Sequence, residues 1–380
     1  MPDVAFPVPA PRGRGRGDDR DPVTSLLESA VAGGGIPGLV AIASREPALL
    51  HRWVLGQADT VPSRPMRPDT VFDLASLTKV VATTTVILAL IGQGEVALDD
   101  PVTQYLPRFE ACRAGPVTVR HLLTHTSGLP KSRTFYRWCR SRDELLRDLH
   151  QTTLEAPPGS RVAYSDLGFI ALGEVVTAVS GSPLDRATAD LVTGPLGMTA
   201  TSFNPAGPPE RFAATEPISL TEPISLTEPI SLTEPTTSGS WCGTVHDENA
   251  RLMGGVAGHA GLFAPAIDLA RFAAWWVSDA DTVVPAALRR AATTCQTTPP
   301  TLGSRGFGWT CPGDAFDILG GHWPATAVSH TGFTGTSLAL DPASGRWLVL
   351  LTNAVHAGRD ATAIMALRRA VHAAIVPGQP

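Results

Sequence analysis

Lysine is almost absent from this chain of 380 residues. Its 28 arginines are accompanied by only two lysines, Lys79 and Lys131. Only 17% of the residues are charged, and the net charge of −5 is spread along the sequence, which argues against a surface for nucleic acid. The one dense basic stretch, PRGRGRGDDR at residues 11–20, runs directly into acids. It predicts a disordered tail over residues 1–21, with weak RNA contact as the alternative.

Cysteine is also scarce, and no export signal is visible. The five cysteines form no CxxC pair, which argues against a disulfide framework or a zinc site, so no cofactor is expected. The first 22 residues contain no continuous apolar segment of signal-peptide length. We therefore expect a protein of the reducing cytoplasm. From Leu74 to Gly94 the only charge is Lys79, but the threonines around it favour a helix enclosed by protein over a membrane span.

Strand patterns lie at both ends of the chain, with helical patterns between them. This arrangement predicts an α/β (α+β) fold in which both chain ends build one antiparallel sheet, flanked by terminal helices and joined to a mostly helical lobe. We expect one domain over residues 22–380, with the α/β lobe at about 22–75 and 300–380 and the helical lobe at about 76–299. Helices are predicted at 22–34 and 359–376, and strands at 38–45, 49–56, 305–310, 326–333, 334–341 and 346–353.

A tandem repeat interrupts this plan. The hexapeptide TEPISL occurs three times from Thr215 to Leu232, and TEP follows at 233–235. Six residues are far fewer than a solenoid repeat needs, and proline at every sixth position blocks a regular helix or a central strand. We expect a surface loop over residues 215–240, with a docking segment as the alternative.

The segment DLASLTKV, residues 73–80, places Ser76 and Lys79 three residues apart. On a helix this spacing puts both side chains on one face, so the ammonium can reach the hydroxyl. A helix that begins near Ser76 also offers the Ser76 N–H as an oxyanion donor. The helix dipole and the apolar surroundings predict a lowered pKa for Lys79, towards that of a base for the serine proton.

Two further motifs follow along the chain. Tyr164-Ser165-Asp166 begins a helical pattern, with Ser165 or Asp166 as N-cap, and a buried tyrosine beside a capping acid is the alternative. His330-Thr331-Gly332 lies on a predicted strand, where the glycine permits close approach of another backbone or of a substrate. His121 and His125 in HLLTH have the spacing of metal ligands, and HDEN at 246–249 could form a metal cluster. We favour structural histidines for the first and the polar cap of the next helix for the second. No Gly-x-Ser-x-Gly elbow, phosphate loop or dinucleotide fingerprint is present.

In this order, the three motifs resemble those of the serine β-lactamase and penicillin-binding superfamily. With a tyrosine in its second motif, the sequence resembles the branch that contains class C β-lactamases, a DD-carboxypeptidase and esterases. The likeness spans about residues 25–375 and includes HLLTHTSGLP (121–130), VHDENARLMGGVAGHAGLF (245–263) and LLTN near the C-terminus.

The resemblance implies a serine hydrolase that passes through an acyl-enzyme. It makes Ser76 the nucleophile, Lys79 and Tyr164 the residues that move protons, and His330 with Thr331 the groups that orient a substrate carboxylate or assist Tyr164. The N–H groups of Ser76 and Phe333, the latter next to Gly332, would form the oxyanion hole. The expected partner is a small ester, β-lactam or D-Ala peptide, and a protein that keeps the fold without turnover is the alternative.

This chain departs from the family pattern at two positions. Asp166 stands where the family usually has asparagine, and an ionised aspartate cannot donate a hydrogen bond to a substrate amide carbonyl. His330 in place of lysine is a weaker fixed cation at neutral pH. The aspartate favours esters over peptides and β-lactams, and the absence of a visible export signal argues against cell-wall peptides.

Overall fold

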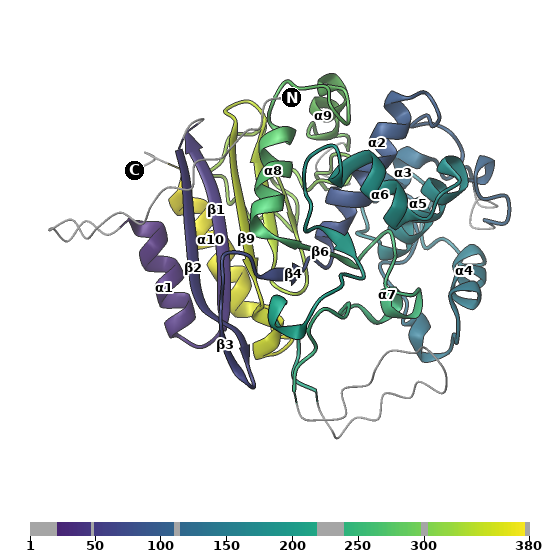
Figure 1. The fold of residues 1–380 in the computed structure, drawn as a ribbon. Helices are drawn as coiled ribbons and strands as arrows, with labels where there is room; N and C mark the ends of the chain where they lie inside the picture. Colours follow the sequence, from purple (N-terminus) through teal and green to yellow (C-terminus); the bar gives the residue numbers. More distant parts are fainter. Residues whose placement is uncertain (1–20, 47–48, 110–114, 219–238, 298–302, 377–380) are drawn as a thin grey trace, which may run out of the picture.

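The computed structural model describes residues 21–46, 49–109, 115–218, 239–297 and 303–376. Its main element is a six-stranded antiparallel sheet in the order β3-β2-β1-β9-β8-β7, built from both ends of the chain as predicted (Figure 1). Leu39 of β1, the third strand in this order, pairs with Thr352 of β9, so the two chain ends meet at the middle of the sheet. The strands are β1 (Gly38–Glu46), β2 (Leu49–Thr60), β3 (Ser63–Pro65), β7 (Val328–Thr331), β8 (Ser337–Asp341) and β9 (Arg346–Thr352).

The terminal helices cover one face of this sheet. Helix α1 (Pro22–Ala32) begins with Asp21 as its N-cap and packs beside α10 (Thr362–Ile375). Successive residues of β1 point to opposite faces of the sheet. Leu39, Ala41 and Ala43 pack with α1 and α10, whereas Val40 and Ile42 belong to the larger core on the other face. Helix α8 (Ala266–Trp276) packs on that second face, between the sheet and the helical part of the molecule (Figure 1).

The middle of the chain is mostly helical. Its longest helix, α5 (Asp166–Ser180), is capped by Ser165, whose Oγ accepts a hydrogen bond from the Gly168 N–H at 3.2 Å. The other helices and turns are η1 (Lys79–Thr84), α2 (Thr85–Gly92), η2 (Val102–Gln104), α3 (Val119–Leu123), η4 (Phe135–Arg137), α4 (Arg142–His150), α6 (Leu184–Thr188), η5 (Ala189–Thr193), η6 (Pro209–Arg211), α7 (Glu248–Leu252), α9 (Ala286–Ala292) and η7 (Ala354–Ala357).

Two parts of the sheet structure differ from the prediction. The strand predicted at 305–310 is wrong, because these residues form only isolated bridges, from Arg305 to Thr310 and from Thr310 to Ser329. A three-stranded sheet of β4 (Val71–Asp73), β6 (Leu262–Pro265) and β5 (Ser202–Phe203) was not predicted. Its strands are two to four residues long, too short to show a period-2 pattern. The predicted N-terminal tail, apart from Asp21, and residues 219–238 of the repeat-containing loop lie outside the described residues.

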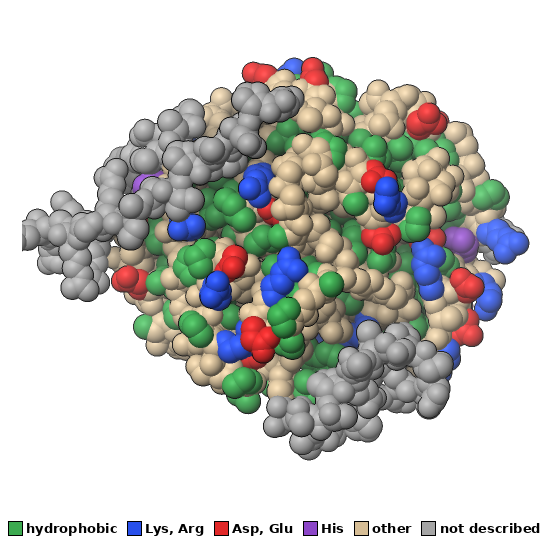
Figure 2. All heavy atoms as spheres, in the orientation of Figure 1, with side chains coloured by type: hydrophobic (Ala, Val, Ile, Leu, Met, Phe, Trp, Pro, Cys, Tyr) green, Lys and Arg blue, Asp and Glu red, His purple; other side chains and the backbone are tan. Residues whose placement is uncertain are grey.

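Charged side chains of both signs are interspersed on the face of the molecule shown in Figure 2. Within the described ranges, no single helix is long and apolar enough to cross a membrane. One bent pair, Asp166–Ser180 with Leu184–Thr193, meets the length and composition criteria together.

Candidate active site

A tight turn presents Ser76 at the end of β4. Ala75 takes a left-handed conformation with φ of 46°, which is costly for a residue with a side chain. The carboxylate of Asp73 holds the turn, because its Oδ1 accepts from the Ala75 N–H at 2.8 Å and its Oδ2 from the His246 N–H at 2.7 Å. Burial raises the pKa of Asp73 against the opposing effect of these hydrogen bonds. The turn leaves Ser76 half-buried at the start of a helix.

Lys79 lies directly behind the serine hydroxyl. Its Nζ donates to Ser76 Oγ at 2.9 Å and to the His259 carbonyl at 3.0 Å, and its side chain is fully buried. The helix around it is not a regular α-helix: residues Lys79–Thr84 form a π-helix, a rare wider coil that is frequent at functional sites. The three-residue spacing therefore brings the two groups into contact, as the sequence predicted.

Asp166 forms an ion pair with this lysine. Its Oδ1 lies 2.7 Å from Lys79 Nζ, so three acceptors surround the ammonium. Burial alone would lower the pKa of Lys79, but the charge of Asp166, with a smaller effect of Tyr164, outweighs it and raises that pKa above its usual value. The predicted lowering of the Lys79 pKa is therefore wrong. Sequence reasoning missed the pairing because it considered Asp166 as a helix cap or as a group facing the substrate.

Tyr164 lies among cations and aromatic rings. Lys79 Nζ is 5.0 Å from the centre of its ring, and the Arg305 guanidinium is 5.7 Å away. The ring of His125 packs on it at 4.6 Å, while His125 Nδ1 accepts from the Ser165 N–H at 3.0 Å. These contacts fix the phenol from several sides. His125 fills the structural role predicted for it.

Arg305 is a site residue that sequence reasoning missed. Its side chain is 1% exposed and forms a two-pronged ion pair with Asp314, at 2.7 and 3.1 Å. The same guanidinium lies 5.3 Å from the ring of Phe316, which in turn packs 5.6 Å from the ring of Tyr164. The wrongly predicted strand at 305–310 concealed this position, because a strand pattern says nothing about a buried guanidinium that faces Tyr164.

His330 is neutral in this site. Burial, together with the nearby charges of Lys79 and Arg305, holds its pKa well below the usual value. Its Nδ1 lies 3.0 Å from the Thr331 carbonyl, which can only accept, so Nε2 is left as an acceptor without a partner among the described residues. The ring lies 6.1 Å from that of Tyr164. A neutral imidazole cannot hold a substrate carboxylate by charge.

Gly332 brings the end of β7 against the turn that precedes Ser76. A side chain at this position would overlap Thr336 Oγ1 and the Leu74 carbonyl, so only glycine fits. The Arg368 guanidinium of α10 donates to the carbonyls of Gly332 and Thr336, at 2.8 and 2.6 Å. The backbone that approaches closely is therefore that of the residues before Ser76, as the glycine predicted.

Two backbone donors remain open at this junction. In the part of the chain that the structure describes, neither the Ser76 N–H nor the Phe333 N–H has a hydrogen-bond partner. The Phe333 side chain is 56% exposed and stacks on the ring of His246 at 5.6 Å. These are the two donors that the sequence predicted for an oxyanion hole.

The segment 245–263 supports Lys79 from the opposite side. Asp247 caps α7 by accepting from the Ala250 N–H at 2.8 Å, as predicted, and also contacts His259 Nε2 at 2.9 Å. Burial alone would raise the pKa of Asp247, but His259 outweighs it and holds that pKa well below its usual range. The described residues contain no group of three or more His, Cys, Asp or Glu side chains that could hold a metal ion.

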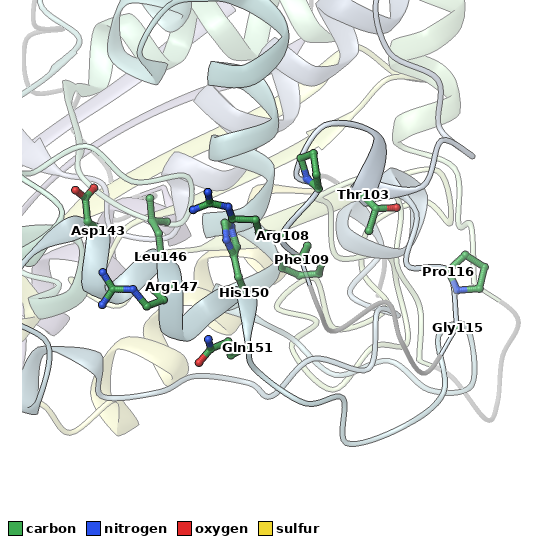
Figure 3. A pocket seen from close by; sticks show the side chains of 11 residues that line it. Thr103, Arg108, Phe109, Gly115, Pro116, Asp143, Leu146, Arg147, His150 and Gln151 are labelled. Carbon is green, nitrogen blue, oxygen red and sulfur yellow. The ribbon is translucent and has the colours of Figure 1, made fainter.

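A separate cavity of about 1120 Å³ lies in the helical part of the molecule, away from these residues (Figure 3). Arg108, Arg147 and His150 line it, beside the ring of Phe109. None of the residues around Ser76 contributes to its wall. The size of this cavity therefore does not point to the residues around Ser76.

Comparison with known proteins agrees with the geometry. The model of the family described as Beta-lactamase matches residues 23–372. The chain is 30% identical over 369 residues to an N-acetylmuramyl-L-alanine amidase of Bacillus subtilis (strain 168), covering 88% of this chain and 80% of the relative. It is 31% identical over 361 residues to a protein of Escherichia coli (strain K12) named "Putative D-alanyl-D-alanine carboxypeptidase", covering 85% and 79%.

A solved structure shares the fold. It is described as EstCE1, a hydrolase with promiscuous acyltransferase activity, and superposes with a TM-score of 0.72 at 24% identity. The match covers 92% of this chain and 97% of that chain. At this identity the likeness supports the fold alone.

Proposed function

The chain belongs to the β-lactamase family of serine hydrolases, and from this premise we propose that it works through an acyl-enzyme on Ser76. The chain of contacts from Ser76 Oγ to Lys79 Nζ to Asp166 Oδ1, at 2.9 and 2.7 Å, is the observation that carries the proposal. It connects a hydroxyl to a carboxylate through one buried ammonium. Such a connection lets a proton leave the nucleophile without crossing water.

The proton path follows from the charge state of the pair. Lys79 is an ammonium with three acceptors, so it cannot accept the serine proton without giving one up. As Ser76 attacks, its proton passes to Lys79 Nζ while another Nζ proton passes to Asp166 Oδ1. The carboxyl group holds that proton until the next half-reaction. Tyr164 protonates the leaving group, and the cations beside its ring stabilise the negative charge that develops on its oxygen.

The open N–H groups of Ser76 and Phe333 receive the oxyanion of the tetrahedral intermediate. Collapse of the intermediate expels the alcohol or amine and leaves the acyl group on Ser76. Water then attacks the ester with the same groups moving protons in reverse, and the acid is released. Asp314 holds Arg305 against Tyr164, so it acts as a positioning residue in both halves of the cycle.

Carboxylic esters are the substrate class that the site favours. The Asp166 carboxylate offers no donor to an amide carbonyl, and the neutral His330 supplies no charge for the free carboxylate of a D-Ala peptide. Amide hydrolysis is the second candidate, because the two relatives are named as an amidase and a carboxypeptidase at 30% and 31% identity. The two candidate reactions share the nucleophile and differ in the leaving group bonded to the carbonyl carbon, which is an alcohol in an ester and an amine in an amide.

A panel of hydrolysis assays tests the proposal. Wild type is expected to hydrolyse p-nitrophenyl acetate, and Ser76→Ala to lose about 10³-fold or more of kcat. Lys79→Ala and Tyr164→Phe should both lose activity, whereas Lys131→Ala, which removes the only other lysine, should retain it. Loss in Lys79→Ala with full activity in Tyr164→Phe would contradict the shared role of these residues. Nitrocefin and D-Ala-D-Ala peptides in the same panel separate esters from the second candidate.

A further inference from the structure

No hydrogen bond to the second carboxylate oxygen of Asp166 is found among the described residues. Lys79 Nζ lies 2.7 Å from Oδ1, and no described N–H or O–H group donates to Oδ2. The side chain is 24% exposed, so solvent and substrate can reach it. An oxygen of an ionised carboxylate can only accept, and it is a strong acceptor for an O–H or N–H group.

The backbone holds this carboxylate in a fixed place. The Asp166 N–H donates to the Lys131 carbonyl at 2.9 Å, and Ser165 before it is tied on both sides, with Oγ donating to Pro130 O at 2.7 Å and N–H donating to His125 Nδ1 at 3.0 Å. Asp166 is also the first residue of α5. A group held this firmly can select a ligand by geometry as well as by charge.

The carboxylate lies beside the point of attack. A single ammonium, that of Lys79, separates it from Ser76 Oγ. In an acyl-enzyme on Ser76, a substituent on the carbon next to the carbonyl is three bonds from Oγ, so it can reach a carboxylate that only the Lys79 ammonium separates from Oγ. Phe316, which packs on Tyr164, and Phe333 are 43% and 56% exposed and give the site apolar walls. A substrate that covers them removes water and strengthens a hydrogen bond to the carboxylate.

We propose that Oδ2 of Asp166 is a specificity group for acyl chains that carry a hydroxyl or amino group on the carbon next to the scissile carbonyl. This inference rests on the proposed function and names its substrate class. An acyl chain with an ether oxygen at that position places a lone pair against the carboxylate and is rejected. The site thus selects hydrogen-bond donors where an asparagine would select acceptors.

Two matched esters test the inference. p-Nitrophenyl hydroxyacetate and p-nitrophenyl methoxyacetate differ by one methyl group, which replaces the donating hydrogen. The ratio of their kcat/KM values cancels any general effect of a variant on proton transfer, and its change in Asp166→Asn separates the lost donor from the added bulk. After correction for spontaneous hydrolysis, wild type should favour the hydroxy ester by about tenfold or more, as expected for one hydrogen bond to a charged group. Equal kcat/KM values for the two esters in wild type would overturn the inference.

Asp166→Asn supplies the reciprocal test. Its amide can keep an oxygen on Lys79 and turn a donor towards the substrate, so the methoxy ester should gain relative to the hydroxy ester and the wild-type preference should fall at least several-fold. The exposed Asp185→Asn is the matched control and should keep the wild-type ratio. An unchanged ratio in Asp166→Asn would also overturn the inference. Failure of wild type to hydrolyse any ester, acetate included, would instead contradict the proposed function.

Discussion

At the scale of single residues, the charge of Asp166 raises the pKa of Lys79, the neighbour of Ser76. Sequence analysis paired Ser76 with Lys79 from their spacing, since a short helical segment fixes which side chains share a face, and it added Tyr164 from the order of the three motifs. It could not identify the partner of Lys79, which lies 87 residues away and comes close only in the folded chain. It also could not assign Arg305 to Tyr164, because no local pattern marks a guanidinium that will be buried.

The scarcity of lysine makes the charge state of Lys79 directly measurable. Protein labelled with ¹³C at lysine Cε should give two signals, and Lys131→Ala should leave only that of Lys79. In wild type, Lys79 should titrate above the usual value of 10.5, since the charge of Asp166 outweighs burial. In Asp166→Asn its pKa should fall, because burial then acts without that opposing charge. Titration of Lys79 below 10.5 in wild type would refute the ion-pair account.

The same pair affects stability in a defined pH range. A lysine whose pKa is raised on folding contributes its full stabilisation below its unfolded pKa and loses it as the pH rises through the folded pKa. The contribution of the pair should therefore be constant through neutral pH and decline only in the alkaline range above 10.5. Urea unfolding of wild type and Asp166→Asn at neutral and alkaline pH would measure it, and a difference that grew with rising pH would contradict the assignment.

At the scale of elements, helix α10 supports the loop that packs against the turn before Ser76. The Arg368 side chain reaches from α10 to the loop between β7 and β8, and burial lowers its pKa to about 9. The strands at both chain ends were predictable because each has a run of strand-forming residues bounded by turn residues. The sheet of β4, β5 and β6 was not, because its short strands are defined by distant partners.

A conservative pair of substitutions tests this support. Arg368→Lys keeps the charge but lacks the planar guanidinium that binds the carbonyls of Gly332 and Thr336. It should lower kcat/KM for ester hydrolysis about tenfold and destabilise the protein by about 1–3 kcal/mol. Arg369→Lys, at the next and exposed position of α10, is the control and should match wild type in both assays. Identical behaviour of the two variants would remove the supporting role.

At the scale of the whole molecule, we expect the hexapeptide repeat to be separable from the fold. The Ile218 N–H donates to the Gly239 carbonyl at 2.7 Å, and Pro217 pairs with Ser240, so the chain leaves and returns at one place. Glu216 at the base of this pair contacts Arg359 at 2.6 Å and His246 at 3.3 Å, which anchors the base to the rest of the protein. We therefore expect the base to be structural and the residues beyond it to be dispensable for hydrolysis.

Replacement of residues 219–238 by Asn-Gly, the sequence of a two-residue hairpin turn, tests this separation. The shortened protein should keep its kcat/KM for p-nitrophenyl acetate within about twofold and its melting temperature within a few degrees. The reason is that the contacts of Glu216 and of the Pro217–Ser240 pair are kept. The Glu216→Ala variant, which disrupts the base itself, should lower the melting temperature. Loss of hydrolysis in the shortened protein would show that the repeat takes part in catalysis.

The central claim is that Ser76 carries the acyl group during turnover, and mass spectrometry of the trapped protein tests it most directly. Wild type treated with a fluorophosphonate, or quenched with acid during hydrolysis of a p-nitrophenyl ester, should gain the mass of one phosphonyl or acyl group, located on the peptide that contains Ser76. Ser76→Ala should gain none under the same conditions. An unmodified wild-type protein during active turnover, or an equal gain of mass in Ser76→Ala, would contradict the account.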